Sequence, residues 1–310
     1  MGLANVVPGV SGGTIALLAG IFERFINSLK SFDAEALKLL FKGRFKEFAE
    51  HTDLLFLVVL IAGEAIGILT LSNLLNLIYN NISNGEFFVQ AFFFGLIFIS
   101  VYYIGKTIDK FTPQVVAFML VGAAVAITVS LLTPASENDN MFYLVVCGAI
   151  AICDMLLPGI SGSYTLILLG NYRLVMTEAL PHFDFNILIP FGIGVVIGFL
   201  AFSRFLSWLM KNYKNQVTGV LTGFVFGSLL YLWPWKKPIY MHALNGEEVM
   251  DRHGKAIVEG YDRFMPDFNT DTFIALALII VGIALLMSIE EIAARKSRKK
   301  IEENSGDSML

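Results

Sequence analysis

Long apolar runs dominate this chain, and two of them are interrupted by the same short motif. The runs cover residues 3–22, 54–79, 87–104, 113–132, 142–169, 187–210, 217–233 and 272–289. A helix needs about 20 apolar residues to cross the roughly 30 Å hydrocarbon core of a bilayer, and most of these runs approach or exceed that length. Since 56% of residues are hydrophobic and only 15% charged, the sequence predicts an all-α polytopic membrane protein.

The two interrupted runs read VVPGVSGGTIALLAG and LLPGISGSYTLILLG. Their helix-breaking pairs, Pro8–Gly9 and Pro158–Gly159, are 150 residues apart. Downstream, IGILTLSNLL from Ile66 resembles IGFLAFSRFL from Ile197, so the pieces follow in the same order. We interpret this as an internal duplication, which is common in transporters. It divides the chain into a first membrane repeat (1–135), a second membrane repeat (136–294) and a basic, then polar, tail (295–310).

The distribution of Lys and Arg indicates how the runs cross the membrane, because these residues favour short cytoplasmic loops. If every run spans, the 22 basic residues divide 14 to 8 between the two sides; if each interrupted run enters and leaves on one side, they divide 16 to 6. The second arrangement predicts an inverted repeat, each half having one re-entrant broken-helix hairpin and three transmembrane helices. It places both termini and an interfacial helix over 31–50 in the cytoplasm, with loop 235–271 outside.

Each motif ends one helix and begins another at a serine, Ser11 or Ser161. Irregular backbone at membrane depth is tolerated only inside protein or beside water, so we expect the two breaks to meet within the molecule. Helix N-termini carry partial positive charge and unpaired N–H groups, and two opposed ends would bind an anion. The candidate binding residues are Ser11, Gly12, Gly13, Thr14, Ser161, Gly162, Ser163 and Tyr164. The alternative is that these small residues only pack helices tightly.

Ionisable residues within or beside the runs form a second group of candidates. Glu64 and Asp154 lie in apolar sequence without a nearby base, a costly placement that often marks function. Together with Glu23 they are candidates for coupling to protons, with sodium as the other candidate ion. Arg24, Arg173 and Arg204 lie near the ends of runs, where they would either contact a phosphate or extend to the membrane surface.

Cofactor and nucleic-acid sites are not predicted. The four histidines all lie in connections, and no His, Cys, Asp or Glu spacing is typical of a metal site. There is also no basic groove with interleaved aromatic residues. The expected partners are therefore membrane lipids and an anionic substrate.

The segments LANVVPGVSGGTIALLAGIFERF and AICDMLLPGISGSYTLILLGNYR together resemble the bacterial polyprenyl-phosphate transporter family. The resemblance extends over nearly the whole chain. It implies a multi-pass protein of the bacterial cytoplasmic membrane that returns undecaprenyl phosphate, a carrier lipid, to the inner leaflet. The family pattern covers Pro8, Gly9, Ser11, Gly12, Gly13, Thr14, Glu23, Arg24, Pro158, Gly159, Ser161, Gly162 and Ser163. This chain departs from it at Asn5, where the family usually has an acid.

Two other functions would use similar features. Undecaprenyl-diphosphate phosphatases also have inverted repeats and a Pro-Gly-x-Ser motif, but an arginine follows their serine where this chain has Gly12 and Gly162. The apolar runs also lack a histidine to act as nucleophile or base. A channel or exchanger for a small inorganic anion could use the same helix ends. We expect a lipid transporter and no enzymatic activity.

Overall fold

The computed structural model describes residues 1–2, 11–132, 135–159, 162–240 and 258–307. Within these ranges, six helices are long and apolar enough to cross a membrane. They are α6 (Leu54–Asn81), α7 (Gly85–Gly105), α8 (Pro113–Leu131), α12 (Phe185–Asn212), α13 (Lys214–Leu232) and α14 (Thr270–Asp307). They coincide with the six predicted spans, and the prediction of an all-α polytopic membrane protein is confirmed.

Shorter elements lie between and beside the spans. They are α2 (Gly12–Leu18), α3 (Phe22–Lys30), α4 (Ala34–Phe41), α5 (Phe45–His51), α9 (Met141–Leu156), α10 (Gly162–Leu168), the π-helix η1 (Arg173–Ala179) and α11 (Leu180–His182). Two strands, β1 (Lys236–Tyr240) and β2 (Val258–Arg263), form an antiparallel pair. The sequence did not predict these strands within loop 235–271.

The segment predicted as one interfacial helix over 31–50 is instead two short helices. Asp33 caps α4 as expected, because its carboxylate accepts hydrogen bonds of 3.0 Å from the N–H groups of Glu35 and Ala36. The chain then turns at Gly43, whose φ of 70° suits a residue without a side chain, and α5 follows. The prediction of a continuous helix was wrong because this glycine ends it.

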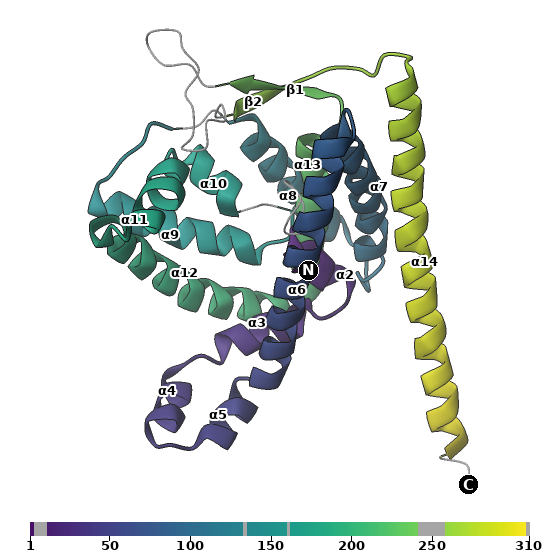
Figure 1. Ribbon diagram of the computed structural model, residues 1–310. Coiled ribbons are helices and arrows are strands. Elements are labelled where there is room, and N and C mark those ends of the chain that lie inside the picture. The colour runs from purple at the N-terminus through teal and green to yellow at the C-terminus, as the bar shows by residue number, and fades with distance from the viewer. Residues whose placement is uncertain (3–10, 133–134, 160–161, 241–257, 308–310) are drawn as a thin grey trace.

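The spanning helices pack in pairs, α8 with α13 and α7 with α14, while α9 packs on α12 (Figure 1). Glycines allow the close approach: a Cβ at Gly223 of α13 would lie 2.0 Å from the carbonyl oxygen of Met119, and one at Gly95 of α7 would lie 2.1 Å from that of Ile279. Small residues of this kind let membrane helices contact each other through their backbones.

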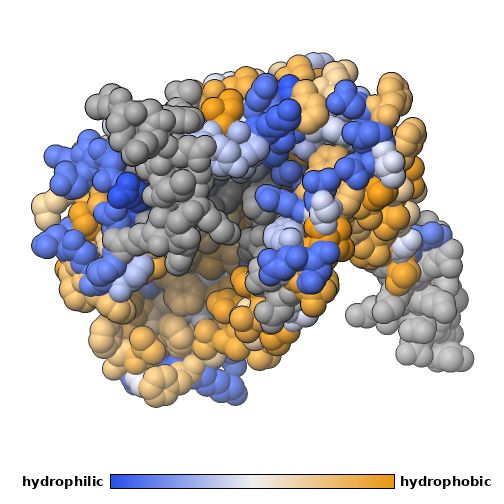
Figure 2. Space-filling view, turned by 45° about the horizontal axis from the view of Figure 1, so that its top comes forward, coloured by the Kyte–Doolittle hydropathy of each residue, from blue (hydrophilic) through white to orange (hydrophobic). Residues whose placement is uncertain are grey.

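The two ends of the molecule differ. The end with β1 and β2, here called the strand face, lies opposite the end with α4, α5 and the last turns of α14, here called the tail face (Figure 1). Figure 2 looks toward the strand face and shows hydrophilic residues gathered on it, with hydrophobic residues covering the flanks. Only 6% of the stretch Leu54–Leu71 of α6 is buried, as expected for a helix whose neighbours are lipid tails.

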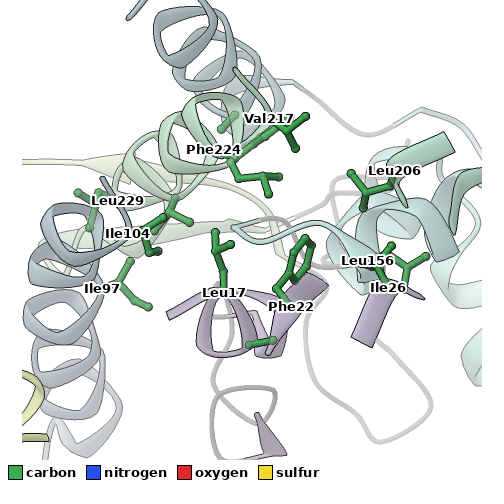
Figure 3. Packing of buried hydrophobic residues seen from close by; sticks show 14 of the residues in the cluster. Leu17, Phe22, Ile26, Ile97, Ile104, Leu156, Leu206, Val217, Phe224 and Leu229 are labelled. Carbon is green, nitrogen blue, oxygen red and sulfur yellow. The ribbon is translucent and has the colours of Figure 1, made fainter. Parts of the chain in front are cut away.

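The largest core cluster surrounds the place where the two motif segments meet (Figure 3). Leu17 of α2 and Phe22 and Ile26 of α3 come from the first motif region, and Leu156 ends the helix before the second break. Phe224 of α13 lies in the same cluster. Apolar packing therefore holds both broken segments against the spanning helices.

Candidate functional site

The structure brings the two Pro-Gly-x-Ser-Gly segments into contact. Ser11, at the start of α2, donates a 3.3 Å hydrogen bond from Oγ to the carbonyl oxygen of Leu157, 146 residues away. A Cβ at Gly13 would lie 3.3 Å from the backbone nitrogen of Pro158, so only a residue without a side chain fits easily there. We call this contact the motif junction. Pro8, Gly9 and Ser161 lie outside the described residues.

Ser11 also caps α2, as the sequence predicts for a serine at this position. Its Oγ accepts the N–H of Gly13 at 3.2 Å, and its carbonyl oxygen accepts the N–H of Thr14 at 3.0 Å. Ser11 and Thr14 are both buried. The expectation of an open N–H group at Gly13 is therefore not met in this conformation, because the Ser11 hydroxyl accepts it.

The second broken segment is fixed against two neighbours. Gly159 has a φ of 88°, and a Cβ there would lie 2.9 Å from the carbonyl carbon and oxygen of Phe224 on α13. Across the break, the hydroxyl of Thr165 on α10 donates a hydrogen bond to the carboxylate of Asp154 on α9. Asp154 thus ties the two helices of this segment together.

The Tyr164 side chain contacts α8 and α13. Its hydroxyl donates a 3.4 Å hydrogen bond to the carbonyl oxygen of Val129 on α8, and its ring centre is 4.8 Å from that of Tyr231 on α13. Gly162 and Ser163 begin α10, and their surroundings lie outside the described part of the structure. Of the predicted binding residues in the second motif, Tyr164 alone can therefore be placed by its side chain, and it lies toward the strand face.

A polar cavity of about 530 Å³ opens between α3 and the start of α6. Its lining consists almost entirely of polar residues: Gly20, Glu23, Arg24, Asn27, Ser28, Ser31, His51 and Asp53. Arg24 donates to both carboxylate oxygens of Asp53, at 2.6 and 3.0 Å, and its guanidinium lies 4.3 Å from the centre of the Phe56 ring. The Arg24 guanidinium holds the pKa of Asp53 below its usual value. We call this the α3 cavity.

The remaining ionisable candidates are distributed over the molecule. Glu23 pairs with Lys214 at 3.7 Å, Arg173 pairs with Glu178 at 2.9 Å, and Arg204 donates to the Leu200 carbonyl oxygen at 2.7 Å. Glu64 lies midway along α6. The N-terminal Gly2 packs against its backbone, so that a Cβ at Gly2 would be 2.1 Å from the Glu64 carbonyl oxygen. The described contacts thus bring neither Arg173 nor Arg204 to the motif junction.

Sequence reasoning missed Asp53 as the partner of Arg24. A signal was available, because Asp53 is the last charged residue before the apolar run of α6 and follows the basic segment that contains Arg24. It also missed the paired strands and the cations they carry. Residue spacing gave no indication that Lys236 and Arg263 would be neighbours.

These observations define a polytopic α-helical membrane protein in which the two motif segments contact each other and a polar cavity lies between α3 and the start of α6. The chain matches the family described as VCA0040-like, undecaprenyl phosphate translocase-like, over residues 1–249. It is 33% identical over 297 residues to the polyprenyl-phosphate transporter of Vibrio cholerae serotype O1, covering 95% of this chain and 94% of the relative. The chain belongs to this undecaprenyl phosphate translocase-like family.

A second relative gives the same indication. The chain is 32% identical over 251 residues to the polyprenyl-phosphate transporter of Staphylococcus aureus, covering 76% of this chain and 83% of the relative. No solved structure gave a significant match. The names of both relatives indicate a transporter of a polyprenyl phosphate rather than an enzyme.

Proposed function

We propose that this protein carries undecaprenyl phosphate across the bacterial cytoplasmic membrane, from the outer to the inner leaflet. The substrate joins one phosphate to a very long apolar tail. Burying the charged headgroup in hydrocarbon is costly, so a carrier must shield the phosphate while the tail remains in lipid. The exposed apolar surface of α6 and the polar α3 cavity supply these two environments. The family membership and the names of both relatives support this substrate.

The observation that carries the proposal is the motif junction. Ser11 donates to Leu157 and accepts from Gly13, so one hydroxyl both joins the two motifs and occupies a helix-end donor. A phosphate arriving there would take over the N–H group of Gly13 if the Ser11 hydroxyl turned away, and those of Gly12 and Thr14 if the start of α2 also moved away from the Ser11 carbonyl oxygen. In the proposed cycle this exchange opens the junction when the headgroup is present and closes it again afterwards.

The α3 cavity is the proposed headgroup site on the cytoplasmic side. Guanidinium groups bind phosphate through two parallel hydrogen bonds, the same geometry that Arg24 makes with Asp53. A phosphate could therefore replace the Asp53 carboxylate on Arg24. Asn27 and Ser28, which also line the cavity, would supply further polar contacts.

An inverted repeat and cytoplasmic termini remain part of this proposal. If the two repeats are interchanged, α8 corresponds to α14 and α13 to α7. The pairing of α8 with α13 therefore corresponds to that of α14 with α7, as an internal duplication predicts. The division of basic residues supports a cytoplasmic position for the tail face. Coupling to a proton or sodium ion is proposed at Asp154, Glu64 or Glu23, with Asp154 placed best because it bridges the broken helices.

Bacterial cells test the function directly. In cells depleted of their other carriers, we expect expression of this protein to lower the amount of undecaprenyl phosphate exposed at the outer surface, measured with a surface-restricted ligand for the lipid. An empty vector and an inactive variant of equal abundance are the controls. An unchanged surface pool, together with chloride or inorganic phosphate flux through the protein, would replace the lipid carrier by a small-anion transporter.

A further inference from the structure

Two cations lie directly opposite each other at the strand face. Lys236 on β1 and Arg263 on β2 are register partners in the antiparallel pair. Like charges in this arrangement destabilise a sheet. Among the described side chains, which do not include those of residues 241–259, no carboxylate lies within ion-pair distance of either residue. Among the side chains that the structure describes, this pair of cations is therefore not neutralised by a direct ion pair.

Helix ends compensate only part of this charge. The Lys236 ammonium donates to the carbonyl oxygen of Tyr231, and Arg263 donates to those of Leu230 at 3.0 Å and Ser130 at 3.4 Å. These carbonyls belong to the last turns of α13 and α8. A helix C-terminus carries roughly half a negative charge, so two helix ends offset about one of the two positive charges. When Lys236 is protonated, a net positive charge of about one unit remains.

Three tyrosines complete the site. The Lys236 ammonium lies 4.6 and 4.1 Å from the ring centres of Tyr231 and Tyr261, and these two rings are 5.7 Å apart. Tyr231 in turn contacts Tyr164, which follows the second motif on α10. The cluster thus joins the strand pair to α10, and it places the rings of Tyr231 and Tyr261 against the Lys236 ammonium.

Burial and the nearby Arg263 charge lower the pKa of Lys236 to about 7, while Glu86 acts weakly in the opposite direction. An unliganded lysine in this position is close to losing its proton at neutral pH. A bound anion would favour the charged form, so ligand binding and protonation of Lys236 would support each other.

We propose that Lys236, Arg263 and the three tyrosines form a binding site for a phosphate monoester at the strand face. This proposal rests on the proposed function: the ligand is the headgroup of the lipid as it enters from the outer leaflet. Free inorganic phosphate has the same chemistry and is the other source. The site lies next to α10, so a headgroup released from it would reach the second motif first.

Binding measurements on purified protein in nanodiscs test this site. We expect Lys236→Gln and Arg263→Gln each to weaken undecaprenyl phosphate binding about tenfold or more at pH 6.5. The matched control is Lys237→Gln, since Lys237 is exposed on the same strand. Lys236→Arg should keep wild-type affinity, which separates charge from folding, and thermal unfolding checks each variant. Undecaprenol, which lacks the phosphate, should not bind at this site, and competition by inorganic phosphate shows whether the tail contributes.

The pH dependence adds a second readout. Above pH 7 Lys236 loses its proton in the empty protein, so wild-type binding should weaken between pH 6.5 and 8.5 by more than the binding of Lys236→Arg. Both proteins experience the same ionisation of the phosphate. Parallel pH profiles, or glutamine variants with wild-type affinity, would overturn the site while leaving lipid transport intact. Binding that depends on Lys236 without any movement of lipid between leaflets would instead overturn the proposed function and leave the site standing.

Discussion

Gly159→Val is expected to abolish lipid transport. The residue has a φ of 88°, and its Cβ would lie 2.9 Å from the backbone of Phe224, so valine would both strain the turn and push it away from α13. A side chain in this region of φ costs about 1–3 kcal/mol even in open space. The displaced turn would carry Pro158 away from Gly13 and open the motif junction. Leaflet-to-leaflet transfer of undecaprenyl phosphate by the reconstituted variant measures the effect.

Gly43→Val provides the matched control. Gly43 has a φ of 70°, a strain similar to that of Gly159, but nothing lies within 4 Å of the point where its Cβ would be. It belongs to the turn between α4 and α5, far from the junction in sequence and fold. We expect this variant to lose some stability and retain transport. Equal transport by Gly159→Val and the wild-type protein would show that the junction geometry is not required.

Gly223→Leu is expected to prevent stable folding of the membrane domain. A Cβ at this position would lie 2.0 Å from the carbonyl oxygen of Met119 and 2.8 Å from the nitrogen of Ala123, so α13 and α8 would have to separate. Overpacking a core usually costs about 1–3 kcal/mol, and a backbone clash along the most extensive helix pairing should reach or exceed the upper value. The measurement is the yield of monodisperse protein together with the midpoint of thermal unfolding.

Gly192→Leu is the control for this prediction. Gly192 also lies within a spanning helix, α12, but nothing lies within 4 Å of where its side chain would begin. We expect its yield and unfolding midpoint to match the wild-type protein. If both leucine variants behave alike, close contact of α8 with α13 does not contribute to stability as described.

The spans were predictable because each depends on local composition. A run of about 20 apolar residues can be satisfied in lipid only as a helix, whatever surrounds it. The short helices α4 and α5 were less predictable, since one glycine at position 43 decides between one helix and two. The strand pair joins residues separated by a long loop, and alternation over five or six residues is a weak signal beside such strong apolar runs.

The candidate site, like the fold, was predictable from the sequence only in part. The meeting of the two motifs follows from the physics of broken helices in membranes, and Ser11 and Leu157 fulfil it. The state of the Gly13 N–H group depends on the Ser11 rotamer, which sequence does not specify, whereas the Thr14 N–H is bound by the Ser11 carbonyl oxygen. The pair Arg24–Asp53 and the opposed Lys236 and Arg263 arise from tertiary contacts, so neither could be deduced from spacing.

Lipid transfer by the purified protein in liposomes shows whether the protein moves a polyprenyl phosphate between leaflets. Fluorescent polyprenyl phosphate in the outer leaflet is destroyed by a membrane-impermeant reductant, whereas lipid in the inner leaflet is protected until it moves outward. We expect wild-type protein to expose the protected half rapidly, Gly159→Val to leave it protected, and the matching polyprenol not to be moved. The opposite result is that the inner-leaflet lipid stays protected with folded wild-type protein while the same liposomes pass chloride or inorganic phosphate. That result would contradict the function of a lipid carrier.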